Sequence, residues 1–83
     1  MQQITRTSSQ IGAALRRTRK QLGLSQEQVS AKTKLRQATI SSLESGDSGT
    51  KLETLLDVLA ALNLELVIRS RTKGHVSDIE DIF

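Results

Sequence analysis

Residues 25–46 have the sequence SQEQVSAKTKLRQATISSLESG, which contains signals for two short helices. Ser25 followed by Gln28 three residues later is a capping box, which predicts a helix over about residues 26–32. A second helix is expected over about residues 37–45, before a glycine that can end it. The two short helices and the tight turn between them form the centre of the predicted fold.

The turn, Thr33 to Leu35, makes this pair of helices a helix-turn-helix motif. The apolar residues that must face inward fall at the spacing that packs the two helices together. They are Val29, Leu35, Ile40 and Leu43. The second helix then presents small and polar residues outward, as a helix that enters the major groove of DNA must. They are Arg36, Gln37, Ala38, Thr39, Ser41 and Ser42.

Three of these outward residues suit particular bases. Gln37 can bond an adenine edge through two contacts, and Arg36 can bond a guanine edge in the same way. Ala38 is small enough to approach a thymine methyl group. The pattern therefore indicates direct reading of base sequence by this helix.

Two further helices flank the motif. Ile11, Leu15 and Leu22 recur at helical spacing, so a helix is expected from about Ser9, capped by Ser8, to just before Gly23. A second capping box, Thr50 with Glu53, predicts a helix over about residues 51–62. Its apolar face is expected to hold Leu52, Leu55, Leu56, Leu59 and Leu62.

After Asn63 the spacing of the apolar residues changes from that of a helix to that of a strand. Leu64, Leu66 and Ile68 alternate with Glu65, Val67 and Arg69. A lone strand leaves its backbone groups unpaired, and the same strand of a second copy is the simplest partner. The predicted fold class is therefore all-α with one C-terminal β-strand, which pairs between two subunits of a dimer. The expected dimerisation residues are Leu64, Leu66, Val67 and Ile68. The alternative is an edge strand that folds back on its own helices.

Composition excludes several classes of protein. The 83 residues include no cysteine, one histidine (His75) and one aromatic residue (Phe83). A disulfide framework, a cysteine zinc site and a site built from several histidines of one chain are therefore excluded. No phosphate-binding loop motif is present, and His75 has no rigid frame to orient it as a general base. We expect a protein that is not an enzyme and has no catalytic residue, metal or cofactor.

Charge is distributed unevenly along the chain. Residues 1–51 hold nine basic and three acidic residues, whereas residues 52–83 hold three basic and six acidic ones. A basic first half favours a polyanion such as DNA, although a solvated face is the usual meaning of a short charge run. The same alternatives stay open for Arg16, Arg17 and Lys20.

The segments 23–29, 37–41 and 43–46 together resemble the lambda-repressor-like helix-turn-helix family, also called the Xre or Cro type. The resemblance covers about residues 11–62 and implies a four-helix domain that binds double-stranded DNA at a palindromic operator. It implies that Arg19 and Glu44 form a structural ion pair. It also implies DNA contacts at Gln26, Lys34, Arg36, Gln37, Ala38, Thr39, Ser41 and Ser42. Gln26 and Lys34 would meet phosphates, and Thr39 and Ser42 the phosphates or the groove edge.

Two positions depart from the family pattern. Ser30 stands where alanine is usual, and Lys34 stands where glycine is usual because the turn needs a positive φ. A lysine with positive φ costs roughly 1 kcal/mol. A slightly different turn is therefore a second possibility, and it would change the tilt of the second helix.

A narrower resemblance, to the HipB-type antitoxins, rests on residues 37–41 and 62–68. It implies a repressor that dimerises through a C-terminal strand, represses its own operon and binds a HipA-type serine/threonine kinase toxin. It also implies that the tail docks on the toxin through Ile79, Ile82 and Phe83. The alternative for this tail is a disordered segment, for example one that a protease recognises.

The predicted organisation is a DNA-binding and dimerisation domain over residues 8–71 and a flexible acidic tail over residues 72–83. The predicted function is a transcriptional repressor that acts as the antitoxin of a toxin–antitoxin pair. The alternatives are a stand-alone Xre-type repressor and an interaction module for which DNA binding is secondary. Residues 1–10 do not resemble a signal peptide and no apolar stretch is long enough to span a membrane, so we expect a cytoplasmic, nucleoid-associated protein.

Overall fold

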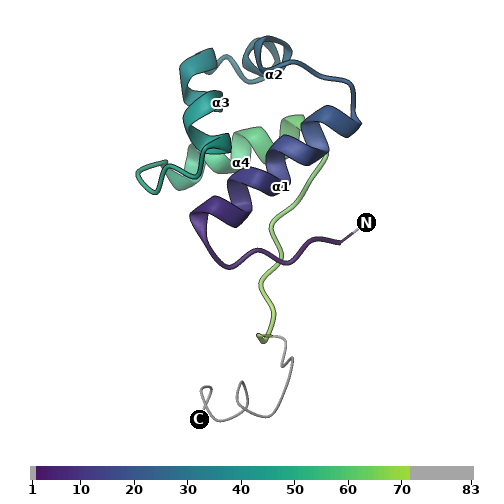
Figure 1. The fold of residues 1–83 in the computed structure, drawn as a ribbon, viewed down its shortest axis with the longest axis vertical. Helices are drawn as coiled ribbons and strands as arrows, with labels where there is room; N and C mark the ends of the chain where they lie inside the picture. Colours follow the sequence, from purple (N-terminus) through teal and green to yellow (C-terminus); the bar gives the residue numbers. More distant parts are fainter. Residues whose placement is uncertain (1, 72–83) are drawn as a thin grey trace.

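The computed structural model describes residues 2–71, and this part of the chain holds four helices (Figure 1). They are α1 (Ser8–Gln21), α2 (Gln26–Thr33), α3 (Gln37–Glu44) and α4 (Leu52–Ala61). The predicted tail, with Ile79, Ile82 and Phe83, lies outside the described residues. None of the helices in residues 2–71 is long and apolar enough to cross a membrane.

Local sequence explains where α1 begins and ends. The helix starts one residue earlier than expected, because the Thr7 side chain, not that of Ser8, accepts a hydrogen bond from the Gln10 backbone N–H at 3.1 Å. The helix ends at Gln21, Leu22 is its C-cap, and Gly23 follows with a φ of +72°. Glycine is favoured at this position because other residues are strained there.

The predicted capping box of α2 is confirmed. The Ser25 hydroxyl accepts from the Gln28 N–H at 3.0 Å, and the Gln28 side chain accepts from the Ser25 N–H at 2.8 Å. Two of the donors that every helix start leaves unpaired are thereby satisfied.

The prediction of a second capping box, Thr50 with Glu53 at the start of α4, is wrong. Lys51, not Thr50, precedes the first residue of α4, and no side chain caps this helix start. The Thr50 hydroxyl instead donates to the Asp47 carbonyl at 3.2 Å, within the loop that follows α3. A local hydroxyl-to-backbone bond has therefore replaced the predicted cap.

The predicted inner face of α4 was partly wrong. Leu52 and Leu56 are 63% and 44% exposed, whereas Val58 and Leu62 are buried. Leu55 and Leu59 are half-buried, and with Val58 they follow the spacing of three and four residues that faces the core. Leu52 and Leu56 therefore lie on the flank of this face.

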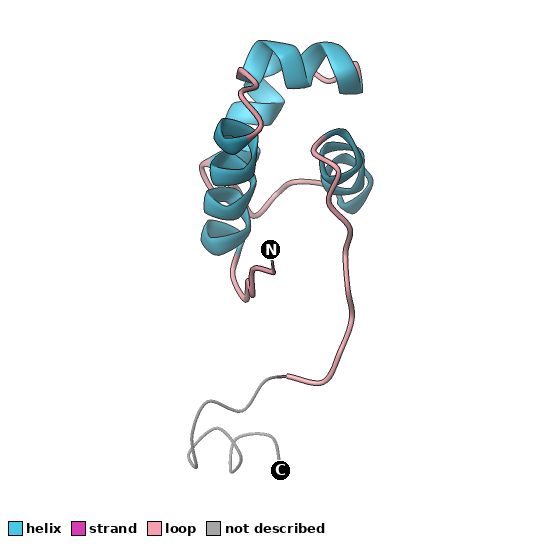
Figure 2. Ribbon diagram, turned by 90° about the vertical axis from the view of Figure 1, so that its right-hand side faces the viewer, coloured by secondary structure: helices cyan, strands magenta, loops and turns pink. Residues whose placement is uncertain are grey.

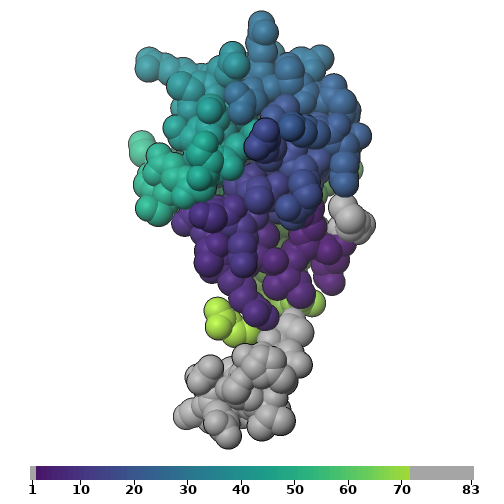
Figure 3. All heavy atoms as spheres, in the orientation of Figure 1, coloured from purple at the N-terminus to yellow at the C-terminus, as the bar shows by residue number. Residues whose placement is uncertain are grey.

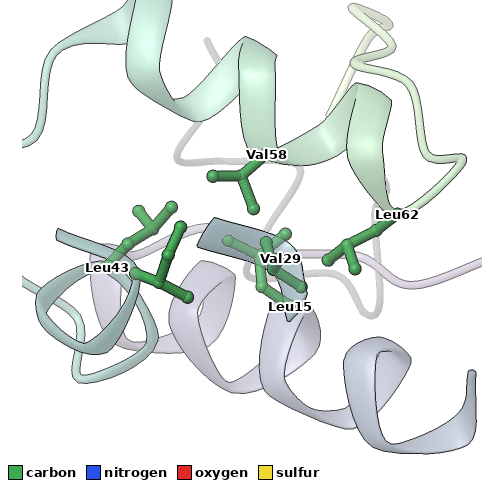
Figure 4. Close-up of a cluster of buried hydrophobic side chains, with 6 residues drawn as sticks. Leu15, Val29, Leu43, Val58 and Leu62 are labelled. Atoms are coloured by element: carbon green, nitrogen blue, oxygen red, sulfur yellow. The ribbon is translucent and has the colours of Figure 1, made fainter. Parts of the chain in front are cut away.

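The core takes apolar side chains from every helix (Figure 4). Its buried members are Leu15, Val29, Ile40, Leu43, Val58 and Leu62. Burying side chains of this size contributes roughly 1.5–3 kcal/mol each. The partly buried Leu35 packs against the cluster, so the four predicted inward-facing residues of the helix-turn-helix all contact the core.

The predicted strand is absent from the described part of the single chain, which contains no strand at all. Asn63, with a φ of +58°, turns the chain, and residues 64–71 then leave the helices as a loop (Figure 2). Leu64 packs against the core, but Leu66, Val67 and Ile68 are exposed. A strand needs a hydrogen-bonded neighbour, and residues 2–71 of one chain supply none. The alternative of an edge strand folded onto its own helices is also not found.

Gly12 sits where α1 crosses the end of α3. A Cβ atom at this position would lie 2.6 Å from the carbonyl oxygens of Leu43 and Glu44. Backbone oxygens cannot move aside as a flexible side chain can. The two helices can therefore approach this closely only with glycine at residue 12.

We expect Gly12→Ala to lower the free energy of unfolding by roughly 1–3 kcal/mol, because the added methyl group forces α1 and α3 apart. The sign is informative, since glycine to alanine inside a helix normally stabilises by roughly 0.5–1 kcal/mol. Urea unfolding followed by circular dichroism measures the change. Gly49→Ala is the matched control, because its Cβ would meet only the Asp47 side chain, at 3.3 Å. Equal effects of the two substitutions would contradict the tight crossing.

Candidate nucleic-acid interface

The turn between α2 and α3 adopts the conformation that glycine usually provides. Lys34 has a φ of +62° and a ψ of +15°, in the left-handed region. The lysine has therefore not produced a turn of a different type. The backbone carries the strain of a side chain with positive φ, about 1 kcal/mol.

Side-chain hydrogen bonds hold this turn from both sides. The Thr33 hydroxyl donates to the Val29 carbonyl at 2.9 Å and accepts from the Leu35 N–H at 3.2 Å. The Ser30 hydroxyl donates to the Leu35 carbonyl. Serine at residue 30 thus adds a bond across the turn that alanine lacks. These contacts fix where α3 begins relative to α2.

A buried ion pair joins α1 to the end of α3. The Arg19 Nε donates to Glu44 Oε2 at 2.6 Å, and Arg19 Nη2 donates to Glu44 Oε1 at 3.0 Å. The two side chains are only 10% and 7% exposed. The hydrogen bond to Glu44 raises the pKa of Arg19 above its ordinary value, although burial acts in the opposite direction. The ion pair implied by the family resemblance is therefore present.

The same ion pair also reaches the start of α2. Arg19 Nη1 donates to the Leu24 carbonyl at 2.8 Å, and the Gln26 amide donates to Glu44 Oε1 at 3.2 Å. Fork-shaped, charge-assisted pairs of this kind have a defined geometry. Three helices are therefore held at fixed relative positions around one buried carboxylate.

The predicted DNA-contact residues gather on α2, the turn and α3, and of these α2 lies at the end of the helical part away from the N-terminal segment (Figure 3). Six of them are exposed: Lys34, Arg36, Gln37, Ala38, Ser41 and Ser42. Thr39 is half-buried, which places it at the margin of this surface. Ile40 and Leu43, on the other face of α3, are anchored in the core.

Gln26 differs from the other predicted contacts. Its side chain is half-buried and its amide is engaged by Glu44, so the side chain belongs to the ion-pair network. Its backbone lies in the first turn of α2, where helices leave N–H groups unpaired. The backbone of Gln26 therefore lies where a phosphate contact was predicted, whereas its side chain is engaged by Glu44.

The start of α3 has no side-chain cap. Arg36 precedes the helix with extended backbone angles, and no side chain caps this end. The Arg36 guanidinium is not used as a cap and is exposed. The first N–H groups of α3 therefore remain for water or a ligand.

The three basic residues on the exposed face of α1 differ in their contacts. Arg16, Arg17 and Lys20 are all exposed. Arg17, however, donates to the Gln3 side chain at 2.6 Å, which commits it to the N-terminal segment. A structural role thus accounts for Arg17, while Arg16 and Lys20 keep both alternatives.

Several residues that are important for the structure were not identified from the sequence. They are Gly12 at the helix crossing, Gln26 as a partner of Glu44, and Gln3, whose amide binds both Arg17 and Thr18. A glycine inside a helical pattern was a usable sign for Gly12. Nothing local marks the other two, because their partners are far away in the sequence.

The four residues predicted to mediate dimerisation do not have equivalent surroundings in the single chain. Leu64 packs against the core, while the three residues Leu66, Val67 and Ile68 are all exposed.

Within residues 2–71, no three His, Cys, Asp or Glu side chains come close enough to hold a metal ion.

We expect Glu44→Gln to lower the free energy of unfolding by about 3–5 kcal/mol, because it leaves the buried Arg19 guanidinium without its counter-charge. Thermal and urea unfolding measure the loss. Glu27→Gln, on the exposed first turn of α2, is the control and should stay within roughly 0.5 kcal/mol of the parent. A loss at Glu44 no larger than that at Glu27 would show that the ion pair does not hold the helices together.

Comparison with known proteins places these features in a family. The Helix-turn-helix family model matches residues 15–68, about two thirds of the chain. No curated protein matches the chain.

Solved structures of HipB give close matches to the fold. The chain in a HipB–O4 20mer complex is 28% identical and superposes with a TM-score of 0.80, covering 86% of this chain and 100% of that one. A HipA–HipB–O2–O3 complex gives the same identity, score and coverage. A HipB–O1–O2 complex is 30% identical with a TM-score of 0.76, covering 84% of this chain and 100% of that one.

Proposed function

The chain belongs to the helix-turn-helix family of DNA-binding domains, and we propose that it is a sequence-specific transcriptional repressor that binds DNA through α3. One observation carries this proposal. Gln37, Ala38 and Ser41 on the outer face of α3, and Arg36 just before the helix, are exposed. Ile40 and Leu43 fix the opposite face of α3 in the core. A rigid helix with a small, polar outer face has the shape and chemistry that the major groove accepts.

Base reading falls to the residues at the start of α3. Gln37 offers an amide that matches the two-point pattern of adenine, and Arg36 offers a fork that matches guanine. Ala38, next to them, accommodates a thymine methyl group. Ser41, one turn further along, completes this set of proposed base contacts.

Phosphate contacts surround the base-reading residues. The Lys34 ammonium group is exposed at the turn, and the backbone at Gln26 lies in the first turn of α2, which attracts anions. Thr39 and Ser42 bound the outer face of α3 and meet the phosphates or the groove edge. Such contacts supply affinity without reading sequence, and they make binding sensitive to salt.

Dimerisation brings two copies of α3 to one DNA site. The exposed Leu66, Val67 and Ile68 support this proposal, because three large apolar residues in a row need a cover. Leu64 continues the segment from the core. With two-fold symmetry, the two α3 helices would enter successive major grooves about 34 Å apart on a palindromic operator.

Gln37→Ala and Lys34→Gly separate base reading from phosphate binding. With DNA from upstream of the protein's own gene, we expect Gln37→Ala to cost roughly 1–3 kcal/mol and to relax specificity at one base pair. Lys34→Gly should weaken binding to all sequences and reduce the salt slope by about 1 for each phosphate that the protein no longer binds. Fluorescence anisotropy across salt concentrations measures both effects.

Glycine at residue 34 also removes the positive-φ strain, so Lys34→Gly should raise the free energy of unfolding by about 1 kcal/mol while it lowers DNA affinity. A decrease in DNA affinity together with a decrease in stability would mean misfolding and not the removal of a phosphate-binding group. An equal decrease on all sequences for Gln37→Ala would contradict its role in base reading.

We also propose that this repressor is the antitoxin of a toxin–antitoxin pair, autoregulates its operon in the cytoplasm and binds a HipA-like serine/threonine kinase. The support is the match over the whole HipB chain of a complex that contains HipA. The proposed docking residues are Ile79, Ile82 and Phe83. A stand-alone repressor is the alternative, because the fold and its DNA-binding surface serve either role.

Capture of the kinase encoded beside the gene distinguishes the two. We expect the tagged full chain to retain this kinase in a pull-down and a chain that ends at Arg71 to retain much less. Retention by both forms would move the contact from the tail to the folded helices. Retention by neither, with DNA binding intact, would leave a stand-alone repressor as the function.

A further inference from the structure

An N-terminal arm, defined here as residues 2–7, runs beside α1 at the end of the molecule opposite α2 (Figure 1). Gln3 attaches it, because its amide nitrogen donates to the Thr18 hydroxyl at 3.2 Å and its oxygen accepts from Arg17 at 2.6 Å. Thr18 is buried, so the arm is anchored to a fixed part of α1. The arm is therefore part of the folded structure.

The arm forms one wall of a groove with a volume of about 870 Å³. The opposite wall is the C-terminal segment, residues 63–71. The floor is apolar and consists of Ile11, Ala14 and Leu15 from α1 and Leu55 and Leu59 from α4. This groove is an open channel with an apolar floor between two non-helical segments.

Both walls of the groove offer unpaired backbone. Within residues 2–71, neither residues 2–5 nor residues 65–68 make a backbone–backbone hydrogen bond. Exposure alternates along the arm, with Gln3 and Thr5 half-buried between the exposed Gln2, Ile4 and Arg6. That alternation is the side-chain period of a β-strand. Residues 2–5 and 65–68 therefore carry backbone donors and acceptors that have no backbone partner within residues 2–71, and the arm also has the alternation of a strand.

We propose that residues 64–68 of a second copy of this chain fill the groove and pair with the N-terminal arm. This inference rests on the proposed dimer and extends it. The occupant is argued from the chain itself, because Leu66 and Ile68, which share one face of a strand, are 54% and 93% exposed and match the apolar floor. A five-residue strand is about 17 Å long, which is also the extended length of residues 2–6.

Symmetry defines the resulting assembly. Each groove lies between an arm and the C-terminal segment of the same chain, so the partner's segment enters between them. With a two-fold axis, the order of strands is arm, partner's segment, segment, partner's arm. The arms thus become the edge strands of a four-stranded sheet shared by two chains, and they cover both edges of the central pair. Four strands form a far more stable unit than an isolated two-stranded ribbon.

Disulfide trapping tests the inference directly, because the chain contains no cysteine. One preparation carries Ile4→Cys or Thr5→Cys, and a second, of different size through a tag, carries Leu66→Cys or Val67→Cys. Mixing and mild oxidation should give a disulfide-linked pair of the two sizes. In the control, the second preparation carries Lys32→Cys, on the exposed surface of α2, instead of Leu66→Cys or Val67→Cys. This control should give no disulfide-linked pair.

Sedimentation equilibrium of the full chain supplies an independent readout. Gln3→Ala should weaken dimerisation about tenfold, because it frees the arm, while Gln21→Ala, an exposed glutamine at the far end of α1, should have no effect. Circular dichroism should show unchanged helix content in both variants.

The outcomes separate this inference from the proposed dimer. Links between Val67→Cys chains with none to the arm, and an unchanged dimer in Gln3→Ala, would overturn the arm's role and leave the dimer standing. A parent chain that is monomeric at every concentration would overturn both. Arm-to-segment links together with a weaker Gln3→Ala dimer support the shared sheet.

Discussion

The buried ion pair between Arg19 and Glu44 is the contact on which the position of α3 depends. Arg19 uses all three of its guanidinium nitrogens, two on Glu44 and one on the Leu24 carbonyl. Glu44 also accepts from Gln26 at the start of α2. A buried charge is costly unless it is paired in this complete way, so the network allows few other arrangements of the helices. The close approach at Gly12 brings Glu44 within reach of α1.

The turn before α3 shows a second constraint, of the opposite kind. Lys34 holds a left-handed conformation that glycine would adopt without strain. The hydroxyls of Thr33 and Ser30 tie the turn to Val29 and Leu35, and the core fixes both helices that flank it. The surrounding structure therefore enforces the strain, as is typical where a strained residue serves a function. A positive charge at the edge of the α3 surface is the property that glycine would not provide.

Much of this fold was predictable from local patterns. Helical spacing, the Ser25 capping box and the glycines after α1 and α3 located the four helices to within about two residues. The inward-facing residues of α2 and α3 were also correct, because the motif leaves them no other orientation. Leu52 and Leu56 were misplaced because spacing alone does not fix which flank of α4 meets the other helices.

The remaining features depend on contacts between distant parts of the chain or between chains. Gly12 matters only because α3 lies against it, and Gln3 only because Thr18 and Arg17 lie beside it. Residues 64–68 form no strand in the single copy, since residues 2–71 supply no hydrogen-bonded neighbour for one. The proposed contacts of α3 with bases share this property, because the second surface is the DNA itself.

Two copies of α3, related by two-fold symmetry, are proposed to read DNA in successive major grooves, and the proposed repressor function depends on this arrangement. Selection of bound duplexes from a random-sequence pool by the full-length protein tests it most directly. We expect an enriched inverted repeat whose half-site centres are one helical turn apart, about 10 base pairs. Enrichment of a single unrepeated motif, or no enrichment over the starting pool, would contradict it.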